Sequence, residues 1–354
     1  VDYSGVKRYT ARMNLETRVA ERYAFGVNLT TSLINDDFVS NGVGLNENGG
    51  ALYAAINYDP TISIRDENGD FNRSPFITID NPLALAQGEQ AFAKTFNTLG
   101  TIYGEYFFIP QLSARVKLGG SMSNSRRDVW IDPISLDGQQ NNGIATIIAA
   151  NRSQYLVEGT LHFSEDYGKH SINSVAGVTI ERFDSESFNG NGRGFALPDL
   201  QTNAIGSGDP LLNQIGSGRN FTKLASYLGR VNYSYDSRYL FTFSMRADGS
   251  SRFGPNNRFG FFPSAAVAWK IHEEAFLKGN NTINQLKFRA SYGVIGNQSI
   301  PNYLFLTSFA LNNQDAVLGD RRITAIGPSR AANPDLRWEE TNQLDIGIDF
   351  GLWN

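Results

Sequence analysis

The residue types that most often carry chemistry are few in this sequence and lie far apart. The three histidines, His162, His170 and His272, do not have the spacing of zinc ligands, and a closed zinc site needs several ligands. There is no cysteine, which excludes thiolate metal sites and disulfides. No Gly-x-Ser-x-Gly elbow occurs, and the acidic residues form no evident catalytic pair. We therefore expect no catalytic residue, no metal and no cofactor, and we expect His170 at the start of a strand near a membrane interface.

Two short motifs resemble ligand-binding loops. The segment Asp66-Glu67-Asn68-Gly69-Asp70 is acidic, but it lacks the twelve-residue spacing and the final glutamate of a calcium loop. Its Asn-Gly pair favours a tight turn instead. The segment 190–194 (GNGRG) is rich in glycine, but it does not lead from a buried strand into a helix, so nucleotide binding is not indicated.

A larger group of charged residues falls on the polar side of alternating segments. If these segments are strands of a transmembrane barrel, the charges face the lumen, because Arg or Lys facing lipid costs roughly 2–4 kcal/mol near the midplane. The interpretation we favour is a solvated lumen with cross-strand ion pairs, and the alternative is a path for a substrate. The residues concerned are Arg115, Lys117, Arg230, Arg246, Lys287, Arg289, Asp345 and Asp349.

Three aromatic residues are candidates for ligand binding. Trp130, Phe195 and Tyr303 fall in segments that we expect to be long loops. Their rings can stack on a sugar or a peptide, or they can pack within their own loops.

The elements that must position these residues are strands, and the clearest are in the stretch 224–276. Residues 227–234, 239–246 and 264–270 alternate between apolar, largely aromatic side chains and small or charged ones, as a pleated strand requires. A three-residue turn at 236–238 is followed by a glycine-rich connection of about fifteen residues. Short turns on one side and long loops on the other are typical of a transmembrane β-barrel, whereas a soluble sandwich buries its aromatic face.

The same alternation predicts about eleven antiparallel strands in all. A short helix near residues 82–93 and a short strand at 303–309 are expected inside two of the long loops. Barrels of this kind have even strand numbers, and plugged outer-membrane transporters have about twenty-two. We therefore expect part of an up-and-down barrel, an open, curved sheet spanning 1–354. The other predicted strands are 8–19, 23–33, 97–108, 112–122, 153–163, 170–181, 286–293 and 344–352, and the long loops are 35–95, 123–151, 182–221 and 294–336.

Three segments carry a resemblance to a known family. They are SRYLFTFSMRADGSSRFGPNNRFGFFPSAAVAWKIHEEAFLK, LKFRASYGVIGNQSIPNY and NPDLRWEETNQLDIGIDFGL, with an aromatic-rich run at Phe259-Gly260-Phe261-Phe262-Pro263. In this order they resemble the barrel of the SusC/RagA-type TonB-linked outer-membrane receptors. The resemblance implies import of an oligosaccharide or peptide, together with a SusD-like surface lipoprotein and TonB as partners and outer-membrane lipid as surroundings. The family's plug and N-terminal extension have no counterpart in these residues, which we expect to be a fragment of the barrel.

Composition agrees with many strands and turns and leaves other functions open. The chain has 354 residues, 35 glycines and a net charge of −4, and without a basic patch it does not indicate a nucleic-acid partner. No run of 18 apolar residues occurs. The interpretation is part of a TonB-dependent importer in the bacterial outer membrane. A passive porin and a surface-exposed β-rich ligand-binding protein are the alternatives.

Overall fold

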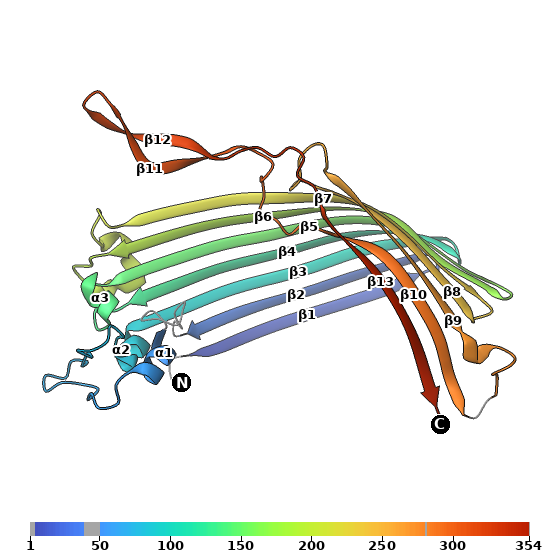
Figure 1. Cartoon of the computed structure of the whole chain (residues 1–354), viewed down its shortest axis with the longest axis horizontal. Coiled ribbons are helices and arrows are strands. Elements are labelled where there is room, and N and C mark those ends of the chain that lie inside the picture. Colours follow the sequence, from blue (N-terminus) through green and yellow to red (C-terminus); the bar gives the residue numbers. More distant parts are fainter. Residues whose placement is uncertain (1–3, 39–49, 280–281, 354) are drawn as a thin grey trace.

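Eleven strands form one curved antiparallel sheet, which dominates the computed structural model (Figure 1). The structure describes residues 4–38, 50–279 and 282–353. The strands of this sheet are β1 Gly5–Val19, β2 Tyr23–Phe38, β3 Glu89–Ile109, β4 Leu112–Ile131, β5 Ile144–Tyr167, β6 His170–Arg193, β7 Gln214–Tyr235, β8 Tyr239–Ser250, β9 Phe259–Lys270, β10 Ile283–Asn297 and β13 Glu339–Leu352. The remaining elements are the hairpin strands β11 Ser308–Leu318 and β12 Arg321–Arg330, the helices α1 Gly50–Asn57, α2 Pro82–Gly88 and α3 Leu136–Gln140, and the 3-10 helices η1 Pro198–Ser207 and η2 Ile271–Glu273.

The sheet has up-and-down topology, because strands adjacent in sequence are adjacent in space. The order is β1 to β10 without a crossover, followed by β13 beside β10. The hairpin β11–β12 forms a separate two-stranded sheet that projects beyond the main sheet in Figure 1. The main sheet is open, with β1 and β13 at its two edges. The predicted architecture, an open part of an antiparallel barrel, is confirmed.

Short connections at one end of the sheet fix the register. Ala20 and Glu21, between β1 and β2, both have positive φ, at 51° and 55°. Asp236 and Ser237, between β7 and β8, have φ of 51° and 54°. Two consecutive residues with positive φ turn the chain in a way that matches the right-handed twist of the flanking strands, as tight hairpins require.

Several strands are longer than their hydrophobic alternation predicts. The predicted loop 123–151 is largely strand, since β4 continues to Ile131 and β5 begins at Ile144. The loop 182–221 is also shorter, because β6 extends to Arg193 and β7 begins at Gln214. The alternation is lost because 123–128, 182–193 and 214–220 are largely polar on both faces, whereas 144–150 is mainly apolar on both, although backbone pairing continues.

Two other loops also differ from the expectation. Within 35–95, α1 and α2 form and β3 begins at Glu89, while residues 39–49 lie outside the described part of the chain. Within 294–336, the hairpin β11–β12 replaces the short strand expected at 303–309. Among the helices of the described residues, none combines the length and the hydrophobicity needed to cross a membrane.

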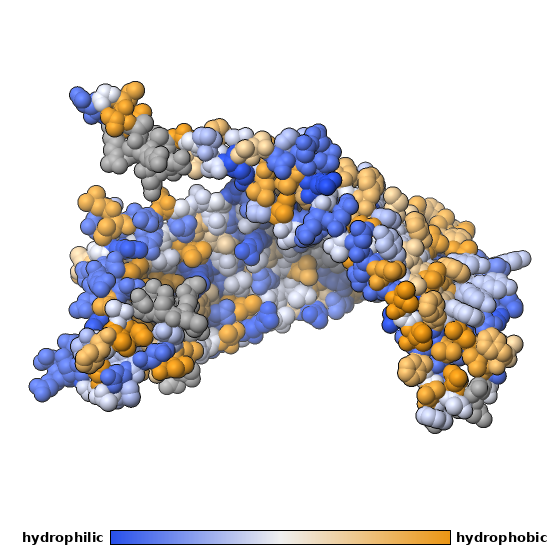
Figure 2. All heavy atoms as spheres, viewed as in Figure 1, coloured by the Kyte–Doolittle hydropathy of each residue, from blue (hydrophilic) through white to orange (hydrophobic). Residues whose placement is uncertain are grey.

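The two faces of the sheet differ in chemistry. On one face, Leu15, Val27, Ile102, Leu118, Val157 and Ile180 form a continuous cross-strand row. Ile102, Leu118 and Val157 in this row are each about half exposed, at 49–52%. We call this side the outer face. The opposite, inner face is concave, and in Figure 2 the hollow in front of the sheet is lined mainly by hydrophilic residues. Such a division is typical of a barrel wall with lipid outside and water inside.

Candidate functional site

The predicted lumen charges lie together on the inner face. Arg115 pairs in register with Thr160, Thr160 with Gly177, Gly177 with Leu228, and Leu228 with Arg246. Side chains at paired positions point to the same side of a sheet, and so do residues two apart in one strand. The structure therefore brings all eight predicted charges to one face, opposite the apolar row. Their facing a lumen in the assembled barrel stays a prediction.

Arg115 is held by an acidic partner that sequence reasoning did not identify. Its Nη2 lies 2.5 Å from Glu105 Oε2 and its Nε 3.0 Å from the same oxygen. Ser113 donates a hydrogen bond to the other oxygen, Glu105 Oε1, at 2.6 Å. The Glu105 side chain is only 7% exposed, so its charge is compensated locally. The Arg115 guanidinium also lies over the ring of Tyr103, 4.6 Å from its centroid.

Two further ion pairs continue along the inner face. Lys117 Nζ lies 3.2 Å from Glu158 Oε1 on the neighbouring strand. Arg246 donates through Nε to the carboxylate of Asp248 and through Nη2 to Ser226 Oγ at 2.9 Å. Glu105 and Glu158 were missed because their pairing depends on the register between strands, which the short turns could have supplied. Asp248 lies two residues from Arg246 in the same strand, and this spacing could have identified it from the sequence.

At the β13 edge, Asp349 is the acceptor for two cations. Arg289 Nε lies 3.3 Å from Asp349 Oδ1, and Lys287 Nζ lies 3.9 Å from Asp349 Oδ2. Asp345 and Arg230 also lie on the inner face, where both are exposed. Neither forms an ion pair with any residue in the described ranges. The predicted cross-strand ion pairs are thus present for some of these charges, and Arg230 and Asp345 remain available to solvent.

Two of the three candidate aromatic residues lie in loops, as expected, and one does not. Trp130 lies in strand β4, whereas Phe195 lies in the connection between β6 and β7. Their rings meet edge to face with centroids 5.2 Å apart, and they are 2% and 0% exposed. In this structure they are core residues with no free ring face. Tyr303 is half-buried and packs edge to face on Phe221 at 6.3 Å. A ligand-binding role for the three residues stays a prediction.

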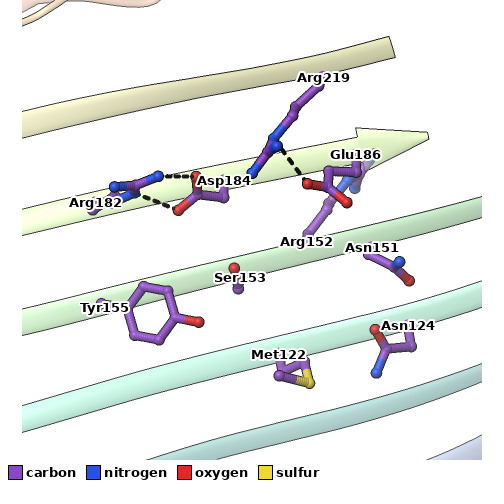
Figure 3. A pocket seen from close by; sticks show the side chains of 10 residues that line it. All are labelled: Met122, Asn124, Asn151, Arg152, Ser153, Tyr155, Arg182, Asp184, Glu186 and Arg219. Atoms are coloured by element: carbon purple, nitrogen blue, oxygen red, sulfur yellow. Dashed lines mark hydrogen bonds and ion pairs between the residues drawn. The ribbon is translucent and has the colours of Figure 1, made fainter. Parts of the chain in front are cut away.

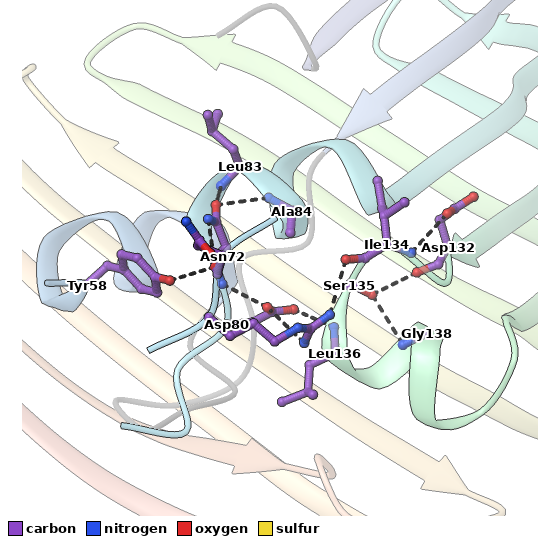
Figure 4. Close-up of polar contacts among 12 residues, drawn as sticks. Tyr58, Asn72, Asp80, Leu83, Ala84, Asp132, Ile134, Ser135, Leu136 and Gly138 are labelled. Carbon is purple, nitrogen blue, oxygen red and sulfur yellow. Dashed lines mark hydrogen bonds and ion pairs between the residues drawn. The ribbon is translucent and has the colours of Figure 1, made fainter. Parts of the chain in front are cut away.

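A hydrogen-bonded network joins two loops at the long-loop end (Figure 4). Asp80 accepts hydrogen bonds from the backbone N–H of Leu136 at 2.5 Å and from Arg73 Nη1 at 3.2 Å. Tyr58 donates to the carbonyl of Asn72 at 2.7 Å. Burial raises the pKa of the Tyr58 phenol, and the carboxylate of Asp80 adds to this increase. The network holds the segment 58–84 against the β4–β5 connection.

Helix caps belong to the same network. Asn81 Oδ1 accepts from the N–H groups of Leu83 and Ala84 at the start of α2, and Ser135 Oγ accepts from Gly138 at the start of α3. Capping of this kind satisfies backbone donors that the helix leaves free.

The aromatic-rich run at 259–263 builds a second core on the inner side. Phe262 contacts Trp338 edge to face at 5.2 Å, and Trp338 contacts Phe253 at 4.9 Å. Trp338 also donates through Nε1 to the carbonyl of Arg258 at 3.2 Å. This packing holds the segment that follows β12 against β9. The aromatic-rich run at 259–263 therefore has a structural role.

The two short motifs have simple backbone roles. Asp66 Oδ1 accepts from the N–H groups of Asn68 and Asp70, and Gly69 has φ of 90°, which defines a tight turn. The segment 190–194 largely continues β6 in pairing with β5. Across the described ranges, no group of three or more His, Asp or Glu residues is arranged to hold a metal ion.

Comparison with known proteins decides the family. The family model described as "TonB dependent receptor-like, beta-barrel" matches residues 12–354. The chain belongs to this family. It is 33% identical to TonB-dependent receptor P3 of Formosa agariphila over 99% of this chain, and 29% identical to TonB-dependent receptor SusC of Bacteroides thetaiotaomicron over 100% of this chain. The SusC/RagA-type resemblance predicted from sequence is confirmed.

A solved structure has the same fold as this chain. The RagAB peptide transporter matches 99% of this chain with a TM-score of 0.81 at 23% identity. The chain spans 35% of the length of P3, 37% of SusC and 39% of the RagAB chain. It therefore corresponds to roughly a third of the length of its relatives.

Proposed function

We propose that this chain forms part of the wall and extracellular loops of a TonB-dependent importer in the bacterial outer membrane. The proposed cargo is a glycan or peptide nutrient, and the proposed partners are TonB and a SusD-like surface lipoprotein, both contacted through parts of a longer receptor. The observation that carries the proposal is the match of residues 12–354 to the TonB-dependent receptor barrel. The relatives named SusC and RagAB support the choice of cargo and partners.

The chemistry of the two faces supports a membrane location. Outer-face side chains such as Phe241, Phe243 and Ile348 are 47–61% exposed in the sheet. Because full burial of such a side chain contributes about 1.5–3 kcal/mol, covering the exposed half with lipid would contribute roughly half of that for each residue. At the short-turn end, Tyr23, Tyr106, Tyr235, Tyr239 and Trp269 lie on the same face, as in an interfacial aromatic girdle.

The inner face supports passage of a polar cargo. Its ion pairs are arranged in rows along the strands, and Arg230 and Asp345 are exposed beside them. We infer that these two residues can contact a cargo in the lumen, whereas the paired charges stabilise the wall.

The test is energy-dependent uptake by the full-length receptor. In cells that lack their own copy, expression of the receptor should restore accumulation of labelled oligosaccharide or peptide, and deletion of TonB should abolish it. Uptake of both cargo classes at the same rate without TonB would contradict the proposal and favour a passive porin. Release of the receptor from membranes by an alkaline wash without detergent would instead favour a surface-exposed binding protein.

A further inference from the structure

On the outer face, the side chains change from apolar to charged on the long-loop side of the row that contains Ile180. The next cross-strand row on the same face contains Gly120, Tyr155, Arg182 and Lys223. The row after that contains Asp184, and the following row pairs Glu186 with Arg219. Cations thus lie on the outer face, next to rows that are apolar toward the short-turn end of the sheet.

The position of these cations matches the membrane boundary. A tilted strand crosses the hydrocarbon core in about ten residues. Counted from the short turn before His170, ten residues of β6 reach about Ile180, so Arg182 lies at the first outer-face position beyond the core. On the long-loop side of a barrel this boundary is the extracellular leaflet. The side chains of Arg182 and Lys223 therefore lie at the depth of lipid headgroups.

Arg182 and Lys223 are directly opposite each other in adjacent strands. Like charges at such positions destabilise a sheet. Asp184 accepts two hydrogen bonds from Arg182, both at 2.7 Å, and offsets part of the repulsion. A guanidinium has five N–H donors, so three of them remain uncommitted. Lys223 forms no ion pair with any other residue that the structure describes, and its ammonium lies 5.9 Å from the ring centroid of Phe221.

A hollow of about 650 Å³ lies beside this pair on β4–β7 (Figure 3). Its lining includes Met122 and Tyr155 on β4 and β5, and Arg182, Asp184, Glu186 and Arg219 on β6 and β7. Arg219 Nε lies 2.9 Å from Glu186 Oε1, and the Arg219 side chain is 72% exposed. The lining contains three arginines, because Arg152 also belongs to it, and two carboxylates, which gives an excess of one positive charge. Lys223, opposite Arg182 in the next strand, adds a further cation beside the hollow. The cations thus lie next to the apolar row of the outer face. An amphipathic anion fits this arrangement, with its charge on the cations and its apolar part on Leu118, Val157 and Ile180.

We propose that the hollow binds the phosphorylated headgroup of an outer-leaflet lipid, with Arg182 and Lys223 contacting the phosphate and the apolar row contacting the acyl chains. The proposal rests on the membrane location given under Proposed function. It does not depend on the nutrient or on TonB. Recruitment of such a lipid relieves the repulsion between the two cations and completes their hydrogen bonds.

The test is lipid binding by the purified full-length receptor in neutral detergent, measured by native mass spectrometry. The probe is a bisphosphorylated acylated disaccharide lipid, compared with the same lipid after removal of its phosphates and with inorganic phosphate. The receptor should bind the phosphorylated lipid most tightly. The double variant Arg182→Gln/Lys223→Gln should weaken this binding about tenfold, since each cation near a lipid surface contributes substantially.

A matched control removes the same charge from the inner face. Arg8 and Arg12 are exposed in β1 and have the opposite strand phase to Leu15, so Arg8→Gln/Arg12→Gln should bind the lipid like the unchanged receptor. Equal binding by Arg182→Gln/Lys223→Gln and the control would overturn the proposal, as would equal binding of the dephosphorylated lipid. Equally tight binding of inorganic phosphate would also overturn it. Loss of TonB-dependent uptake with lipid binding intact would contradict the proposed function alone.

Discussion

The hydroxyl of Tyr103 in β3 donates a hydrogen bond to Glu16 in β1, with 2.7 Å between Oη and Oε1, and thus passes over the whole of β2. The residue between them in the register is Gly26, which pairs with Glu16 on one side and with Tyr103 on the other. A Cβ atom at Gly26 would lie 2.1 Å from Tyr103 Cε1. The absence of a side chain at Gly26 therefore allows β1, an edge strand of the sheet, to be tied to β3.

The first prediction concerns this contact. Gly26→Val should displace the Tyr103 ring and lower the unfolding temperature of the full-length receptor in detergent by at least as much as Tyr103→Phe, because the displaced ring also loses its contact with the Arg115 guanidinium. The two changes should not add in the double variant, because both remove one hydrogen bond. Gly229→Val is the matched control, since no atom lies within 4 Å of a Cβ at Gly229. Additive effects of Gly26→Val and Tyr103→Phe would show that Gly26 acts through something other than this bond.

The second prediction concerns pH and the turn between β7 and β8. Asp236 forms ion pairs with Arg238 and, at 3.1 Å, with Lys169. The hydrogen bond from Arg238 lowers the pKa of Asp236 below its ordinary value of 3.8, and the bond from Lys169 contributes next. A carboxyl whose pKa is lowered by folding stabilises the folded state above its unfolded pKa, and the stabilisation is lost as the pH falls through the folded value.

Unfolding temperatures at about pH 6 and about pH 3 test the role of Asp236, since the ordinary aspartate pKa lies between these values. The receptor should lose stability over this interval, and Asp236→Asn should lose less. Asp166→Asn removes a carboxylate from the same end of the sheet that forms no ion pair with another residue in the described part of the chain, and it should behave like the unchanged receptor. An identical loss for Asp236→Asn and the unchanged receptor would exclude Asp236 as a source of the pH dependence.

The third prediction concerns two of the aromatic residues that the sequence suggested for ligand binding. Trp130 and Phe195 pack on each other with almost no exposure, so Trp130→Ala should destabilise the rim by about 3–5 kcal/mol, the usual cost of truncating a buried aromatic residue. Faster proteolysis of the loops 132–143 and 194–213 is the expected sign. Phe76→Ala is the control, because Phe76 is 83% exposed in a loop. Unchanged proteolysis together with weakened cargo binding would restore the ligand-binding interpretation.

The sequence predicted the number of sheet strands because alternation is strong wherever one face of the sheet is apolar and the other is polar. The same signal failed toward the long-loop end of the sheet. In β4 the segment 123–131 (SNSRRDVWI) is still paired with β5, but polar residues occupy both faces, and the pattern no longer differs from that of a loop. The acidic partners Glu105 and Glu158 escaped notice for a different reason. An ion pair across strands depends on register, and register is determined by turns that alternation alone does not specify.

The inner face provides the last prediction, because it contains both a paired and an unpaired arginine. Arg115→Ala leaves Glu105, whose side chain is 7% exposed, without its cation, whereas Arg230 forms no ion pair with another residue that the structure describes. Arg115→Ala should therefore lower the free energy of unfolding by about 1–2 kcal/mol, less than for a fully buried pair because Arg115 is 38% exposed. Arg230→Ala should leave stability unchanged.

Uptake should respond to these two substitutions in the reverse order. If exposed lumen charges contact the cargo, Arg230→Ala raises the concentration of cargo needed for half-maximal uptake, whereas Arg115→Ala in correctly folded receptor does so only weakly. Asp345 lies on the same face and also forms no ion pair within the described ranges, and Asp345→Asn should change uptake for a charged peptide more than for a neutral oligosaccharide. Equal uptake by the receptor and by both the Arg230 and the Asp345 variants would assign the inner-face charges to solvation and wall stability alone.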